Sequence, residues 1–147
     1  MADVYNIQET ADQLKEELDW QSTPTPMYPE DFVKIVVWAI KRFYVDVNHP
    51  DEYDRTLFIT DEEDHVCYDH DFDIVQEEYI YILCKLNFYR KVYNDVAGDS
   101  AMSYTTDALS VTGAKEGYKS IQQEIDDLET DRIRVFHKMM ARDVNET

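Results

Sequence analysis

Residues 61–79, DEEDHVCYDHDFDIVQEEY, concentrate the side chains that could bind a metal ion. A calcium site of the EF-hand type is the first chemistry to test, because Asp69, Asp71 and Asp73 match positions one, three and five of that loop. Position six needs a glycine for its sharp turn and position twelve needs a bidentate glutamate, but isoleucine stands at both. The sequence therefore argues against calcium.

Zinc is the second possibility for this segment. His65, Cys67 and His70, with one aspartate, have the right chemistry for a tetrahedral site. However, no second pair of cysteines or histidines stands at a recognised spacing elsewhere, since His49 and His137 are isolated. In an extended chain His70 also points away from the face that carries His65 and Cys67. We predict no metal site, with zinc at these residues as the alternative.

An acidic surface that leads into a helix explains the segment better. Asp73 followed by Gln76 fits a capping box, in which Asp73 accepts from amides of the first helical turn. Residues 46–78 hold thirteen acidic residues against the single Arg55. We name seven of these acids, which are clustered before and at the start of the helix, the acidic lobe: Asp61, Glu62, Glu63, Asp64, Asp69, Asp71 and Asp73.

Catalytic patterns are weak in the rest of the chain. Three serines in 97–113 have no histidine at a suggestive spacing, and no glycine-rich phosphate loop occurs. All-α nucleotide pyrophosphohydrolases bind magnesium with acid pairs one helical turn apart on the inner faces of a bundle. Such pairs are present here, but they fall beside the apolar stripes: Glu9/Asp12, Glu16/Asp19 and Glu124/Asp127. We interpret them as solvated surface and predict no enzyme, no catalytic residue and no cofactor.

The elements that carry these residues are predicted to be helical. Glycine and proline are scarce, and apolar residues recur at helical spacing in four segments, approximately 6–20, 29–47, 74–96 and 114–142. The connections are a proline-rich segment (22–29), an acidic insertion (48–72) in which 57–59 and 66–68 could pair as a β-hairpin, and a Ser/Thr-rich loop (97–113). The prediction is one mainly α domain over 1–147, bundle-like with four helices and a small acidic hairpin between the second and third.

The last two helices suggest contacts with other molecules. The third is apolar on most sides, and the fourth, at up to about 29 residues, would reach roughly 43 Å. We expect their apolar surface to exceed what one copy can bury. The side chains predicted to contact a partner are tyrosines and apolar residues of these helices and the loop between them: Tyr79, Tyr89, Tyr93, Tyr104, Leu109, Val111, Tyr118, Val135 and Met139.

The charge balance limits the partners. A formal net charge of −18 disfavours a nucleic-acid backbone and an anionic membrane surface, and leaves basic proteins, metal ions or mimicry of a polyanion. The longest apolar run, 32–40, is too short to span a bilayer. Two cysteines give no disulfide framework, and no signal peptide is recognisable, so a reduced cytosolic setting is expected.

A family resemblance follows from helix order, size and one segment. The Ser/Thr-rich SYTTDALSVTGAKEGYKSI leads into the helix IQQEIDDLETDRIRVFHKM, and the chain over 29–142 resembles the head–tail connector (adaptor) proteins of tailed bacteriophages. The resemblance implies a helical, non-enzymatic virion subunit that forms a homo-oligomeric ring in the neck. It would contact portal and tail or neck proteins and let DNA pass without specific binding. It would be found in the host cytoplasm during assembly. The acidic insertion and the proline-rich segment match no pattern of that family.

Two functions of other classes remain open. An acidic inhibitor of the anti-restriction type mimics DNA and occupies a basic DNA-binding protein, but its acids should run along an elongated face rather than concentrate in 46–78. The third candidate is the magnesium-dependent nucleotide pyrophosphohydrolase, which would use one of the acid pairs.

Overall fold

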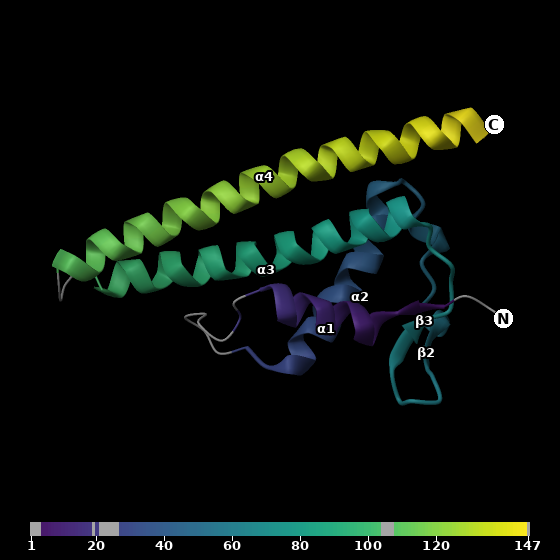
Figure 1. Cartoon of the computed structure of the whole chain (residues 1–147), viewed down its shortest axis with the longest axis horizontal. Helices are drawn as coiled ribbons and strands as arrows, with labels where there is room; N and C mark the ends of the chain where they lie inside the picture. The colour runs from purple at the N-terminus through teal and green to yellow at the C-terminus, as the bar shows by residue number, and fades with distance from the viewer. Residues whose placement is uncertain (1–3, 19, 21–26, 104–107, 147) are drawn as a thin grey trace.

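The computed structural model describes residues 4–18, 20, 27–103 and 108–146, with side chains for 4–18, 20, 27–94 and 120–141. Within these residues the chain is mainly helical and carries a small antiparallel sheet (Figure 1). The helices are α1 (Ile7–Glu17), α2 (Pro29–Asp46), α3 (Ile74–Ser103) and α4 (Ala108–Glu146), with short 3-10 turns η1 (Pro50–Glu52) and η2 (Arg55–Leu57). The strands are β1 (Tyr5–Asn6), β2 (Phe58–Thr60) and β3 (Val66–Tyr68).

Helix starts follow ordinary capping chemistry, which the sequence predicted at the third helix. The Glu9 backbone N–H donates to the side chain of Asn6 before α1, at 3.0 Å. Pro29 opens α2, where the missing N–H of proline costs nothing. At α3 the capping box is confirmed, because the Gln76 N–H donates to Asp73 at 2.9 Å and the Asp73 N–H donates to the Gln76 side chain at 3.0 Å.

The predicted Ser/Thr-rich loop over 97–113 is wrong for most of its length. α3 continues to Ser103 and α4 begins at Ala108, so the two helices form an antiparallel hairpin (Figure 1). Small and hydroxyl-bearing residues have only a modest intrinsic cost in a helix, and pairing with a neighbouring helix can outweigh it. Both helices are therefore longer than predicted, and α4, at 39 residues, spans about 58 Å.

The hairpin predicted between the second and third helices is confirmed, with its first strand shifted by one residue. β2 and β3 pair antiparallel with Phe58 opposite Tyr68 and Thr60 opposite Val66. The sequence did not predict β1, which pairs with the other edge of β3 and places Tyr5 opposite Tyr68. A two-residue strand has no detectable alternation, so only the fold reveals it.

An aromatic cluster fixes this sheet to the helices. Phe72 stacks on Tyr68 with ring centroids 5.9 Å apart, and its edges meet Tyr5 at 5.4 Å and Phe43 of α2 at 5.6 Å. Aromatic pairs at such distances contribute about 0.5–1.5 kcal/mol beyond the area they bury. The acidic insertion is therefore joined to the core through its own aromatic residues.

α3 is the central helix of the core. It packs against α4 most extensively, then α2, and it also contacts α1. Its apolar side chains face these neighbours, which explains why the sequence of α3 is apolar on most sides: Tyr79, Ile80, Ile82, Leu83, Cys84, Leu86, Phe88 and Val92 are all buried.

Among the described side chains, the chain's own core covers much of the apolar surface that these helices were expected to offer to other copies. α4 lays one narrow stripe, Ile125, Leu128, Val135 and Met139, onto the chain's own core. A long helix with a single apolar stripe needs only one neighbour, and α3 provides it.

Candidate functional site

The turn of the β2–β3 hairpin presents the most concentrated charge of the acidic lobe. Its carboxylates come from four consecutive residues, 61–64, and those of 62–64 are exposed. Asp61 organises the turn by accepting from the backbone N–H groups of His65 at 2.8 Å and Glu63 at 2.9 Å. These hydrogen bonds hold the pKa of Asp61 below its usual range. Asp64 adopts a left-handed φ of 63°, which aspartate tolerates.

The rest of the acidic lobe lies where the chain enters α3. Asp69 and Asp71 are exposed, whereas Asp73 is half-buried as the cap of the helix. The interpretation of this segment as a capped, solvated acidic surface therefore matches the described side chains.

The two histidines and the cysteine of this segment do not form one cluster, because only His65 and Cys67 lie near Asp61. Cys67 is buried, its Sγ lies 3.8 Å from Asp61 Oδ2, and His65 Nδ1 is also 3.8 Å from that oxygen. His70 lies elsewhere and packs against the Phe72 ring at 4.8 Å. Burial is the main cause that raises the pKa of the Cys67 thiol. No group of three or more His, Cys, Asp or Glu residues in the described part of the chain is placed to hold a metal ion.

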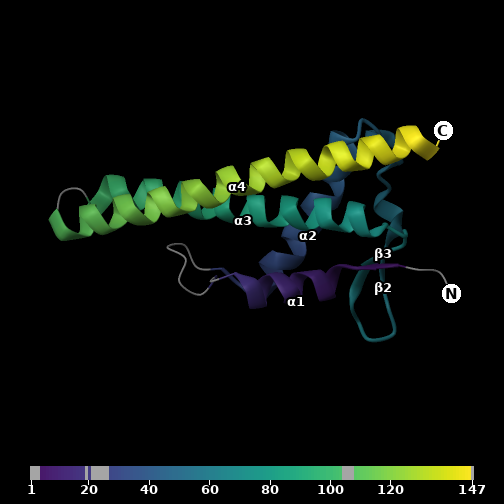
Figure 2. The ribbon, with the colours of Figure 1, turned by 45° about the horizontal axis from the view of Figure 1, so that its top comes forward.

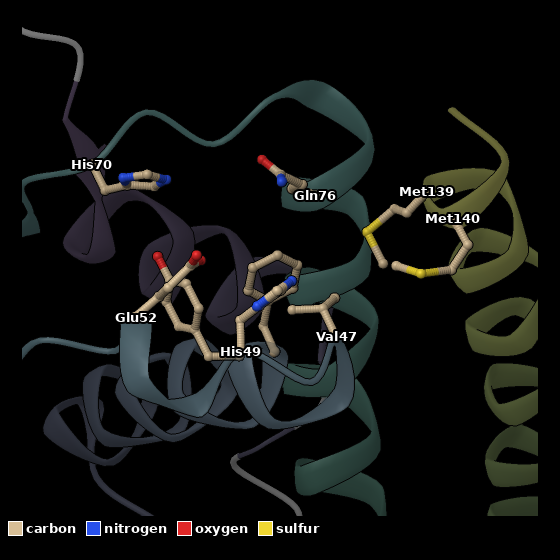
Figure 3. Close-up of a pocket in the computed structure, with 9 residues that line it drawn as sticks. Val47, His49, Glu52, His70, Gln76, Met139 and Met140 are labelled. Carbon is tan, nitrogen blue, oxygen red and sulfur yellow. The ribbon is translucent and has the colours of Figure 1, made fainter. Parts of the chain in front are cut away.

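An open pocket of about 260 Å³ does gather two histidines, although their separation in sequence gives no hint of it. It lies where the end of α2, η1, the start of α3 and the C-terminal half of α4 meet. In Figure 3 His70 and Gln76 lie above His49 and Glu52, and the thioethers of Met139 and Met140 lie to their right, on the side of α4. Among the described residues no serine, cysteine or lysine lines it, so the pocket does not present a hydroxyl nucleophile from serine, a thiol or an amine.

A polar network that the sequence did not predict joins α2, α3 and α4. The Tyr79 hydroxyl donates to Asp46 Oδ2 at 2.6 Å and accepts from Arg132 at 3.3 Å. Arg42 pairs with Asp46 at 2.9 Å. Burial, followed by the hydrogen bond to Asp46, raises the pKa of Tyr79 to about 12. The partners of Tyr79 stand 33 and 53 residues away, which is why no local spacing reveals the network.

This network borders a groove whose centre is Trp38. One hollow of about 350 Å³ lies between Trp38, Arg42 and Asp46 of α2, three residues of α3, and Glu129 and Arg132 of α4. A second of about 250 Å³ lies on the other side of Trp38 and is lined by α2 and α3 alone. We call these two hollows together the Trp38 groove.

Three of the predicted partner contacts must be corrected. Tyr79 and Val135 have no exposed surface and Met139 only 2 %, so these side chains belong to the core of one chain. Tyr89 and Tyr93 are half-buried on α3 and remain partner-contact predictions. The other predicted contacts lie outside the described side chains: Tyr104, Leu109, Val111 and Tyr118.

The acid pairs considered for magnesium lie on solvated helix faces as predicted. Glu9, Asp12 and Glu16 are exposed on α1, and Glu124 and Asp127 are exposed on α4. Asp12 is paired with Lys15 at 3.0 Å. Asp19 lies outside the described residues.

Comparison with known proteins adds no relative: no protein-family model, no curated protein and no solved structure matches the chain. Among the described helices, none combines the length and the apolar character that crossing a membrane requires.

Proposed function

We propose that this chain is a structural, non-enzymatic assembly subunit, and that its setting is the ring of a head–tail connector in a tailed bacteriophage. The observation that carries the proposal is the shape of the α3–α4 hairpin. In both ribbon views its distal end extends past α1 and α2, so that there, of the described helices and strands, only α3 and α4 lie side by side (Figures 1 and 2).

Such a projection suits a subunit that reaches between neighbours. A two-helix hairpin buries one side of each helix and leaves the other sides available, and an enzyme has no evident need of it. The four helices would act as one bundle-like body, because α3 contacts α1, α2 and α4. The acidic hairpin lies at the opposite end of the molecule (Figure 1).

The acidic surface fits the same setting. An assembly that surrounds DNA without gripping it must avoid positive charge on the surface that faces the phosphates. The exposed carboxylates of the acidic lobe and α1 provide such a surface, and the portal and tail or neck proteins would be the partners on either side.

The test is the state of assembly of the purified chain. Sedimentation velocity across a wide concentration range, with negative-stain microscopy of the largest species, should reveal a closed ring. Leu109→Asp with Val111→Asp, at two of the predicted partner contacts, should weaken the ring, and far-ultraviolet circular dichroism and the urea midpoint of the variant are measured alongside to show that the chain still folds. Gln123→Asp with Lys138→Asp, which also adds acids to α4, is the control.

Other outcomes would contradict the proposal. A chain that stays monomeric at high micromolar concentration and displaces DNA from a basic DNA-binding protein would favour mimicry of DNA. Magnesium-dependent turnover of nucleotides that is lost in Glu124→Gln with Asp127→Asn would favour an enzyme.

A further inference from the structure

The Trp38 groove is a basic surface on a strongly acidic chain. Its two hollows are lined by five cationic side chains and three acidic ones, whereas the whole chain carries a net charge of −18. The cations come from all three helices that border the groove: Lys34, Arg42, Arg90, Lys91 and Arg132. A locally basic surface on an acidic chain indicates a binding surface for an anionic partner.

The carboxylates of the groove are already engaged. Asp46 is paired with Arg42 and accepts from Tyr79. Glu129 is shared, because both Arg90 and Arg132 pair with it. Three arginines therefore divide two carboxylates, and positive charge is left over.

Two lysines add to this excess. Lys34 and Lys91 are exposed, and neither forms an ion pair within the described part of the chain. The third acid, Asp31, accepts from the backbone N–H of Tyr28 at the start of α2, at 2.9 Å. Its carboxylate is thus partly used by the helix start.

Trp38 gives the groove an anchor. Its side chain is 38 % exposed between the two hollows, and tryptophan and arginine are the residue types that contribute most at protein interfaces. An exposed aromatic ring next to several cationic side chains can bind a short turn that carries carboxylates.

The chain itself carries such a turn. Residues 61–64 place four acids in succession at the tip of the β2–β3 hairpin, and the hydrogen bonds of Asp61 fix its shape in advance. A preformed turn loses little conformational entropy when it binds. In both views the tip points away from α4, which forms one wall of the groove (Figures 1 and 2).

We propose that the acidic turn at 61–64 of one copy docks into the Trp38 groove of the next copy. Because turn and groove are different surfaces, the contact is heterologous, and repetition of it produces a ring or an open helical filament. The inference rests on the proposed function, since it names the contact through which the assembly subunit would bind its neighbour.

Charge reversal on one side at a time tests the contact. Lys34→Glu with Lys91→Glu makes the groove acidic, and Glu62→Lys with Glu63→Lys makes the turn basic. Charges are weakly screened at about 20 mM NaCl. Under these conditions the affinity of each variant for itself should be lower than that of the wild type by a factor of about ten or more. Sedimentation velocity measures the association.

Mixing the two variants is the decisive arm. The acidic turn of the groove variant fits the basic groove of the turn variant, and the basic turn of the turn variant fits the reversed groove. An equimolar mixture should therefore regain association as an alternating assembly, although neither variant associates strongly alone. A chain that carries all four substitutions should regain self-association through the inverted pair. Control variants of equal charge change are Arg134→Glu with Lys138→Glu and Glu16→Lys with Glu124→Lys, all at exposed positions outside the groove and the turn.

The possible failures differ from one another. If the wild type assembles and both reversed variants assemble equally well, the proposed contact is wrong while the assembly function stands. If the wild type stays monomeric up to high micromolar concentration at low salt, the assembly function itself fails. If the groove variant loses affinity for an unrelated acidic protein and the mixture of the two variants does not associate, the groove serves a different partner and the proposal is overturned.

Discussion

Asp73 is the residue at which the sequence prediction and the structure agree in atomic detail. Its carboxylate accepts from the Gln76 N–H at 2.9 Å at the start of α3. Asp73→Ala removes that acceptor, so we expect a loss of about 1 kcal/mol in the free energy of unfolding. Asp71→Ala removes the same charge from an exposed position and should change stability by less than about 0.5 kcal/mol. Urea denaturation of both variants separates the effect of losing the capping acceptor from the effect of losing a negative charge. Equal losses in the free energy of unfolding would contradict the capping role.

Tyr79 contributes a second effect at the residue scale. Tyr79→Phe keeps the buried ring but removes the hydroxyl that joins Asp46 to Arg132. Hydrogen bonds to charged groups contribute about 1.5–3 kcal/mol, so we expect the free energy of unfolding to fall by an amount in that range. In the variant Asp46 keeps its ion pair with Arg42. Tyr89→Phe, on a half-buried tyrosine of the same helix, is the control and should cost less than about 0.5 kcal/mol.

If the hydroxyl of Tyr79 connects the three helices, its effect should depend on Arg132. A double-mutant cycle of Tyr79→Phe and Arg132→Met should give a coupling energy of about 0.5 kcal/mol or more. Additive losses would mean that Tyr79 and Arg132 stabilise the fold independently and that their contact contributes no coupling energy.

At the scale of elements, sequence reasoning succeeds where the signal is local. The predicted helical ranges 29–47 and 74–96 begin where α2 and α3 begin, because the proline at the start of α2 and the capping box at α3 act within one helical turn. The β2–β3 hairpin was found from two short apolar runs. The extension of α3 and α4 through 97–113 was missed, because it depends on each helix having the other beside it.

The candidate site shows the same division. The acidic turn at 61–64 is visible as consecutive letters in the sequence. The Trp38 groove is not, because its lining residues are spread from Asp31 to Arg132 and only the crossing of α2 over α3 and α4 brings them together. Tyr79 was assigned to a partner interface for the same reason: an apolar periodicity does not specify which neighbour covers it.

The packing of α4 on α3 gives a prediction at this scale. Leu128 is buried in the stripe that faces the core, whereas Ile133 is 47 % exposed on the same helix. Leu128→Ala should lower the free energy of unfolding of the monomer by about 2–5 kcal/mol, and Ile133→Ala by less than about 1 kcal/mol. Urea denaturation at low protein concentration measures both. Equal, small losses would mean that α4 is not held by its own chain.

At the scale of the whole molecule, charge and shape act together. The chain is elongated, with a projecting helical hairpin at one end and the acidic hairpin at the other (Figure 1). Thirteen of its 32 acidic residues lie in 46–78, so negative charge is concentrated near one end, while the Trp38 groove is locally basic. A molecule with this distribution repels its copies in most orientations and attracts them in one.

Salt should therefore change folding and association in opposite directions. A net charge of −18 destabilises the folded monomer by self-repulsion, and shortening the Debye length from about 30 Å at 0.01 M to about 8 Å at 0.15 M weakens that repulsion. We expect the urea midpoint of the dilute chain to rise with NaCl over this range. The contact between the acidic turn and the Trp38 groove depends on attraction across solvent-exposed charges, so the sedimentation coefficient of the concentrated chain should fall over the same range.

The two trends separate specific from general electrostatics. Sodium chloride that strengthens both folding and association would indicate that neighbouring copies meet through apolar surface, with their net charges repelling. The variant with acidic residues at positions 34 and 91 is the internal control. Its urea midpoint should depend more strongly on salt, because its net charge is more negative. Its sedimentation coefficient, in contrast, should not fall with salt as that of the wild type does.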